Sequence, residues 1–211
     1  MICNFRFAIC DCFLQLQIAK LFLGEIVLEK CDVKTEKLIA RLYQTEGRAE
    51  IVDGKIVELD LDGCLPSQAK SNILFSLHGY QKKTKKGFVV STLVAYVVDL
   101  PHRKSFSPSV SFHQGKRTGM KFLQGAPIFA VEVRSENDYG NKAEKAIVKK
   151  RADYFAAGTE IVWDVDLLSE DVIKSYSRNK PNAPRIFRRG EIADSEPALP
   201  NWKMKIDELF D

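Results

Sequence analysis

The stretch IFAVEVRSENDYG, from Ile128 to Gly140, places one carboxylate inside an otherwise apolar run. A short run of β-branched and aromatic residues predicts a buried strand. Because side chains alternate along a strand, Glu132 and Arg134 should lie on one face, opposite the aromatic and valine side chains. An ionised carboxylate is costly to bury unless it is paired or bound to a metal ion. Glu132 is therefore either paired with Arg134 at the rim of a sheet or part of a functional site.

The segment after this strand predicts a helix from about Lys142 to Ala157, ended by Gly158. Its apolar stripe consists of Ala143, Ile147, Tyr154 and Phe155, and its solvated face carries Lys142, Lys145 and Lys149. Lys150 lies against the apolar stripe, from which a long cation either extends to solvent or reaches a phosphate or a water molecule. A strand carboxylate and a helix lysine that converge suit phosphodiester hydrolysis. In that chemistry the carboxylate holds a divalent cation and the lysine stabilises developing charge.

The rest of the chain alternates helical and strand patterns. Helices are expected over 33–47 and from Pro66 to about Lys83, and AEIVDGKIVEL predicts a hairpin with a tight primed turn at Asp53 and Gly54. Further strands are expected within 88–100, 106–113, 160–166 and 171–199, with a short helix near the end of the chain. The strand, helix and strand over 128–166 suit a crossover between parallel strands. The pattern predicts an α/β or α+β fold with a central mixed sheet flanked by helices.

The length and composition fit one main globular domain. The chain has 211 residues, of which 45% are hydrophobic and 28% are charged. Residues 1–32 differ from the rest, because they are rich in Cys, Phe, Leu and Ile without a clean helical or strand period. We therefore expect an N-terminal extension over 1–32 and one globular domain over 33–211; a genuine N-terminal helix is the alternative for the first segment.

The cysteines and the apolar segments exclude several protein classes. Five cysteines, with four of them among the first 31 residues, do not form a disulfide framework, and no C-x-x-C pair suggests zinc. These features indicate a reducing, cytoplasmic location. The most apolar segment, Phe5 to Leu23, is interrupted by Asp11 and Lys20, so neither a membrane span nor a secretory signal is expected.

Charge and the remaining polar residues are less informative. A net charge of +4 is compatible with a nucleic-acid partner but does not require one. Three histidines show no ligand spacing, and Cys64 has no nearby histidine base. No Asp or Glu occurs from Leu100 to Val131. The cations of that segment either contact phosphates or form solvated surface; they are Arg103, Lys104, Lys116, Arg117 and Lys121.

Two stretches resemble a known family. PIFAVEVRSENDYG and KKRADYFAAGTEIVWDVD are similar to the Uma-two family of bacterial restriction endonucleases, within the PD-(D/E)XK nuclease superfamily. AEIVDGKIVEL resembles the opening hairpin of that family and LPNWKMKIDELF its closing segment. The resemblance covers about Val33 to Phe210 and is most specific over 127–166. It implies a restriction-endonuclease-like core, a Mg²⁺ or Mn²⁺ site, DNA as the partner and, since the family often packs as pairs, a homodimer.

The resemblance also assigns site residues. The glutamate of the family's EV-x-S pattern is Glu132, the expected metal ligand, and its lysine is Lys150, while Arg134 occupies the usual E-x-K position. Glu50, before the hairpin turn, is a further candidate acid. The family's Pro-Asp pair falls where this chain has Pro108 and then Ser109. A hydroxyl is a much poorer Mg²⁺ ligand than a carboxylate.

Three functions follow as hypotheses. The first is a Mg²⁺-dependent DNA endonuclease that is weakened or inactive because Ser109 replaces the metal-binding aspartate. The second is a non-catalytic relative that keeps the nuclease fold and binds DNA or a protein. The third is a purely structural interaction module. Metal-dependent cleavage, or DNA binding without cleavage, would separate the first two.

Overall fold

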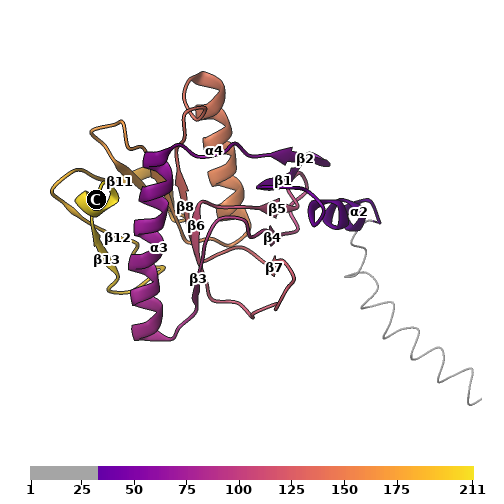
Figure 1. Cartoon of the computed structure of the whole chain (residues 1–211), viewed down its shortest axis with the longest axis horizontal. Coiled ribbons are helices and arrows are strands. Elements are labelled where there is room, and N and C mark those ends of the chain that lie inside the picture. The colour runs from indigo at the N-terminus through magenta and orange to yellow at the C-terminus, as the bar shows by residue number, and fades with distance from the viewer. Residues whose placement is uncertain (1–32) are drawn as a thin grey trace, which may run out of the picture. The chain divides into compact units, whose positions relative to one another are not determined.

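The computed structural model describes residues 33–211, so the expected N-terminal extension lies outside the described residues (Figure 1). The first described element is the helix α2 (Val33–Leu42), which ends earlier than the sequence pattern suggested. Residues 42–211 form one compact unit, which contains the remaining elements. No helix among residues 33–211 is both long and apolar enough to cross a membrane.

A six-stranded sheet forms the centre of this unit. Its strand order is β11 (Lys180–Phe187), β10 (Ile173–Ser177), β9 (Ile161–Val165), β8 (Phe129–Val133), β6 (Val110–His113) and β3 (Phe88–Val90). β8 and β9 are parallel, whereas every other neighbouring pair is antiparallel. The helix α4 (Asn141–Ala156) connects the two parallel strands, as the pattern over 128–166 predicted. The sheet is therefore mixed.

A helix lies on each side of the sheet. The helix α3 (Cys64–Thr84) buries one side chain on nearly every turn against the central strands. Its buried residues Ala69, Ile73 and Leu77 join the core cluster that contains Phe129, Val131, Val133 and Trp163. On the other face, Tyr154 of α4 packs in a second cluster with Ala130 and Val162. The alternation along β8 thus separates the two cores, and the expected fold class is confirmed.

Smaller sheets complete the unit. β5 (Ser105–Phe106), β4 (Tyr96–Val97) and β7 (Leu123–Gln124) form one of them; β12 (Ile192–Asp194) and β13 (Lys203–Lys205) form another. The chain closes with a 3-10 helix, η1 (Ile206–Leu209). Two expectations were wrong in detail. The strand expected over 106–113 is split, because Pro108 between β5 and β6 has no N–H for a ladder. The segment 171–199 contains three strands rather than one or two.

Backbone hydrogen bonds attach the first hairpin to the segment 102–104. This hairpin consists of β1 (Ala49–Val52) and β2 (Lys55–Glu58), and its turn residues Asp53 and Gly54 have φ of 49° and 70°, as a primed turn requires. The Asp53 N–H donates to the His102 carbonyl (2.6 Å), and the Lys104 N–H donates to the Ile51 carbonyl (2.9 Å). These bonds align β1 with the segment before β5 and so bring Glu50 toward α4.

Candidate active site

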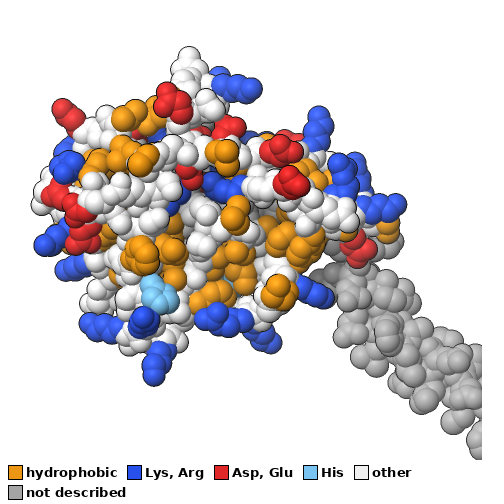
Figure 2. Space-filling view, viewed as in Figure 1, with side chains coloured by type: hydrophobic (Ala, Val, Ile, Leu, Met, Phe, Trp, Pro, Cys, Tyr) orange, Lys and Arg blue, Asp and Glu red, His pale blue; other side chains and the backbone are white. Residues whose placement is uncertain are grey.

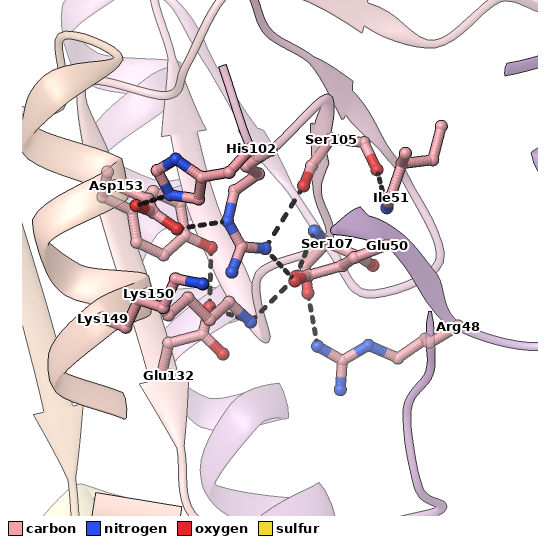
Figure 3. Close-up of polar contacts among 12 residues, drawn as sticks. Arg48, Glu50, Ile51, His102, Ser105, Ser107, Glu132, Lys149, Lys150 and Asp153 are labelled. Atoms are coloured by element: carbon pink, nitrogen blue, oxygen red, sulfur yellow. Dashed lines mark hydrogen bonds and ion pairs between the residues drawn. The ribbon is translucent and has the colours of Figure 1, made fainter. Parts of the chain in front are cut away.

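Glu50 lies at the centre of a buried polar cluster (Figure 3). It is 3% exposed, and both of its oxygens accept hydrogen bonds. Oε2 accepts from Arg103 Nη1 (2.5 Å), while Oε1 accepts from the Ser107 N–H (2.8 Å) and lies 2.9 Å from Lys150 Nζ. Both oxygens of this carboxylate therefore have partners, which removes most of the cost of its burial.

Lys150 connects this carboxylate to the strand acid. Its Nζ lies 2.9 Å from Glu132 Oε1 and 2.9 Å from Glu50 Oε1. Glu132 Oε1 also accepts a hydrogen bond from Tyr154 Oη (2.6 Å), one helical turn after the lysine. Tyr154 is itself held by stacking on Phe106, with ring centroids 4.1 Å apart. The structure thus brings together Glu132 and Lys150, as the strand and helix patterns predicted, and adds Glu50 to them.

A second pair of partners extends the cluster. Asp153 accepts from Arg103 Nε at Oδ2 (2.7 Å), and its Oδ1 lies 2.7 Å from His102 Nε2. Arg103 therefore joins Glu50 to Asp153, just as Lys150 joins Glu50 to Glu132. We call Glu50, Arg103, Glu132, Lys150 and Asp153 the site cluster. Its three carboxylates and two cations leave one formal negative charge.

The pKa shifts in the site cluster follow from burial and pairing. Burial alone would raise the pKa of Glu50, but the charges of Lys150 and Arg103 outweigh it and hold this pKa below 4.5. Burial would likewise lower the pKa of Lys150, but Glu132 and Glu50 hold it above 10.5. For Tyr154, burial and the two nearby carboxylates together raise the pKa well above 10. At neutral pH, Lys150 is a cation and Tyr154 is a hydrogen-bond donor.

A cavity of about 630 Å³ opens beside the site cluster. It lies between the first hairpin, α4 and the strands β8 and β9, and four members of the cluster line it. Its apolar wall includes Val52, Val57, Leu59, Ala143 and Ile147. A concave site with a few converging charged groups is the usual form of a ligand or substrate site.

Arg134 does not pair with Glu132, so the rim-pair interpretation is wrong. Its guanidinium donates to both oxygens of Asp164, with Nε–Oδ1 and Nη2–Oδ2 each 2.8 Å, and it also pairs with Glu144. Although Arg134 occupies the usual E-x-K position, its charge is thus committed to other carboxylates. The lysine that reaches the strand acid comes from α4 instead.

Ser109 bonds to the strand that carries Glu132 but does not line the cavity. It comes directly before β6, whose register with β8 begins at Val110 and Val131. It is 2% exposed and does not line the cavity. Its Oγ accepts a hydrogen bond from the Val133 N–H (3.1 Å), and its own N–H donates to the Val131 carbonyl (3.0 Å). The hydroxyl therefore completes the end of the β-ladder.

The side chains of the site cluster could hold a divalent cation only loosely. Residues 33–211 contain no group of three His, Cys, Asp or Glu side chains placed to hold a metal ion. Both oxygens of Glu50 are already bonded. Glu132 Oε2 accepts no hydrogen bond within the described part of the chain, and Glu132 lines the cavity. One carboxylate and one excess negative charge fit a cation that keeps most of its water ligands.

Sequence reasoning missed two of the five residues of the site cluster, Arg103 and Asp153. Arg103 was expected to contact phosphate or to be solvated, but it is 5% exposed and bonded to two carboxylates. Asp153 and the partner role of Tyr154 were not recognised. Their signal was spacing, because Lys150, Asp153 and Tyr154 occupy positions i, i+3 and i+4 of one helix face.

Comparison with known proteins shows the family of the chain and a related fold. The model of the Uma2 family, described as "Putative restriction endonuclease", matches residues 36–207. The chain belongs to the Uma2 family. This Uma2 chain is similar to a solved structure described as a "putative nuclease belonging to DUF820" from Anabaena variabilis ATCC 29413. The two are 17% identical, with a TM-score of 0.64, and the match covers 79% of this chain and 91% of that chain. At this identity the likeness shows a shared fold. No curated protein matches the chain.

Proposed function

We propose that this Uma2 protein is a DNA endonuclease whose hydrolytic site is formed by Glu132, Lys150 and Glu50 and is weakened by Ser109. The observation that carries the proposal is the position of Lys150 Nζ, 2.9 Å from a carboxylate oxygen of each glutamate, beside the cavity. The three residues come from β8, α4 and β1, so the fold gathers them from distant parts of the sequence. Membership of the Uma2 family supports the same reaction class.

Each residue has a distinct role in this proposal. Glu132 would hold Mg²⁺ or Mn²⁺ through Oε2, because its Oε1 is occupied by Lys150 and Tyr154. The cation, when bound, would polarise a phosphate and lower the pKa of its water ligand. Lys150 stabilises negative charge that develops on the phosphate or orients the attacking water. Glu50, which is held by Arg103, positions Lys150 and helps to keep it charged.

Ser109 explains why activity should be weak. An aspartate at this position could accept the Val133 N–H with one oxygen and offer the second as a metal ligand near Glu132, the residue before Val133. The serine hydroxyl has only one oxygen, and it is already bonded. A cation held by Glu132 alone is less fixed relative to the phosphate, and misplacement by ~1 Å can cost ~100-fold in rate. The same observation favours the alternative of a non-catalytic relative that binds DNA or a protein.

Plasmid nicking tests the proposal. Supercoiled plasmid is incubated with a titration of Mg²⁺ or Mn²⁺ and four proteins: wild type, Glu132→Ala, Lys150→Met and Lys145→Met. Lys145 is exposed on the same helix and does not line the cavity, so it is the matched control. We expect slow, metal-dependent nicking by wild type and Lys145→Met, and none by the other two. Equal nicking by all four proteins would contradict the site, and absence of nicking with either metal would leave the non-catalytic alternative.

We also propose a cytoplasmic homodimer. Two sites related by a two-fold axis are the simplest way to cut both strands of a duplex. The cysteine pattern supports a reducing compartment. Light scattering at high protein concentration should give twice the mass of the 211-residue chain; a strictly monomeric mass would contradict the dimer.

A further inference from the structure

One end of the central sheet carries a cluster of exposed cations, which we call the basic end. It consists of Lys82, Lys83, Lys85, Lys86, Lys116 and Arg117. All six are exposed, and none of them forms an ion pair with a carboxylate of residues 33–211. Figure 2 shows Lys and Arg side chains along the lower edge of the molecule, where Figure 1 places the end of α3.

The fold brings the two basic segments together. β3 pairs with β6 so that Phe88 lies opposite His113, which places 85–87 beside 114–116. A Cβ on Gly87 would lie 2.6 Å from the His113 carbonyl oxygen, and a Cβ on Gly115 would collide with the His113 ring. Glycine at both positions therefore permits the close approach that packs like charges together.

The two segments that form the basic end contain no acids of their own. Residues 63–98 contain no Asp or Glu, and neither do residues 100–131. Like charges that repel one another without neutralising partners destabilise a fold slightly, and a bound anion would relieve that repulsion. Arg117 is also fixed in place, because its guanidinium lies 4.2 Å from the centre of the Phe88 ring. A stacked guanidinium keeps its N–H groups free at the edge for phosphate oxygens.

The basic end lies at the opposite end of the strands from the site cluster. Val110 begins β6 opposite Val131, the residue before Glu132 in β8, whereas His113 ends β6 beside the basic end. The intervening four residues of strand span ~13 Å, which corresponds to about four base pairs of a duplex. Phe88, on which Arg117 stacks, belongs to the same core cluster as Tyr154 and so lies on the face of the sheet that Glu132 shares.

We propose that the basic end binds the phosphate backbone of double-stranded DNA, independently of base sequence, and holds the duplex beside the site cluster. The inference rests on the proposed function, because the partner is the substrate of that site. DNA is favoured over an anionic membrane because the end of α3 has no apolar face beside its lysines that could enter a bilayer. A duplex also presents one negative charge per ~1.7 Å of its axis, which matches closely spaced cations.

Binding can be measured separately from cleavage. The full chain is titrated against a fluorescent duplex of about 20 base pairs in EDTA, and anisotropy is read at several salt concentrations. The basic-end variant carries Lys85→Gln, Lys86→Gln, Lys116→Gln and Arg117→Gln. The control variant loses the same charge at exposed sites elsewhere, by Arg178→Gln, Lys180→Gln, Lys203→Gln and Lys205→Gln. Melting temperatures confirm that both variants fold.

We expect the basic-end variant to bind on the order of 10-fold more weakly, and its log Kd to depend on log salt with a slope smaller by about 3–4. The control variant should stay within about 3-fold of wild type and keep the slope. Equal weakening of both variants, or no duplex binding by wild type at low salt, would overturn the inference. The inference would also be overturned if the basic-end variant still bound the duplex but no longer bound phosphatidylserine vesicles. Binding is read in EDTA, where metal-dependent hydrolysis cannot occur, so a failure of the proposed hydrolysis leaves this result unaffected.

Discussion

Two cationic regions of this protein differ in how their charge is compensated. In the site cluster, Arg103 and Lys150 are largely buried, and each contacts two carboxylates. At the basic end, six cations are exposed without an ion pair among the described residues. A buried charge must be paired within the fold, whereas an exposed charge is stabilised by water and remains available to bind a charged partner. The first region should therefore govern stability and chemistry, and the second should govern attraction of a polyanion.

The largest effect should come from breaking the buried pairing. Glu50→Gln keeps the shape of the side chain but leaves Arg103 and Lys150 short of a negative partner. We expect a loss of about 3–5 kcal/mol in the free energy of unfolding, measured with urea. The matched change Glu58→Gln, on the exposed strand of the same hairpin, should cost less than about 0.5 kcal/mol. Equal costs for the two variants would show that the cluster does not contribute to stability.

The pairing of Glu50 also predicts that the stability of the fold depends on pH, with an effect smaller than that of Glu50→Gln at neutral pH. The pKa of Glu50 is held below 4.5 in the folded protein, so its ionised form stabilises the fold fully above pH 4.5. This stabilisation is lost as the pH falls through the folded-state pKa, because the native carboxylate must then bind a proton. The difference in melting temperature between wild type and Glu50→Gln should therefore shrink as the pH is lowered below 4.5. A difference that stays constant down to strongly acidic pH would contradict the assigned charge state.

The smallest effect should appear at the basic end without DNA. Repulsion among its exposed cations should make wild type more stable by less than about 1 kcal/mol when salt screens these charges. The basic-end variant should lose that salt dependence, while the control variant keeps it. Urea unfolding at low and moderate NaCl measures the difference. An unchanged salt dependence in the basic-end variant would mean that its cations do not repel one another appreciably.

The sequence predicted the parts of the site that local periodicity defines. The alternation around Glu132 and the position of Lys150 against an apolar stripe follow from strand and helix geometry. The hairpin turn at Asp53 and Gly54 was likewise a local signal, confirmed by positive φ at both residues. These features depend on neighbours within a few residues, so a single sequence reveals them.

The partners of these residues required tertiary structure. Arg103 reaches Asp153 across 50 residues and Glu50 across 53, and no local pattern distinguishes such a buried arginine from a solvated one. The hairpin docks through backbone bonds to 102–104, which carry no side-chain signal. Pro108 is a local signal for the break between β5 and β6, but the alternating pattern over 106–113 favoured one continuous strand.

The substitution Ser109→Asp tests most directly whether this is a nuclease site weakened at one ligand. The variant, its uncharged counterpart Ser109→Asn and the double variant Ser109→Asp with Glu132→Ala are compared with wild type by plasmid nicking and by melting with and without Mg²⁺. A buried second carboxylate should destabilise the fold without metal, and Mg²⁺ should restore stability by linkage. We predict that Ser109→Asp nicks plasmid on the order of 10–100-fold faster than wild type. Only this variant should gain a Mg²⁺-dependent rise in melting temperature, and Glu132→Ala should abolish both gains. Nicking by wild type as fast as by Ser109→Asp, or gains that survive in the double variant, would contradict the account.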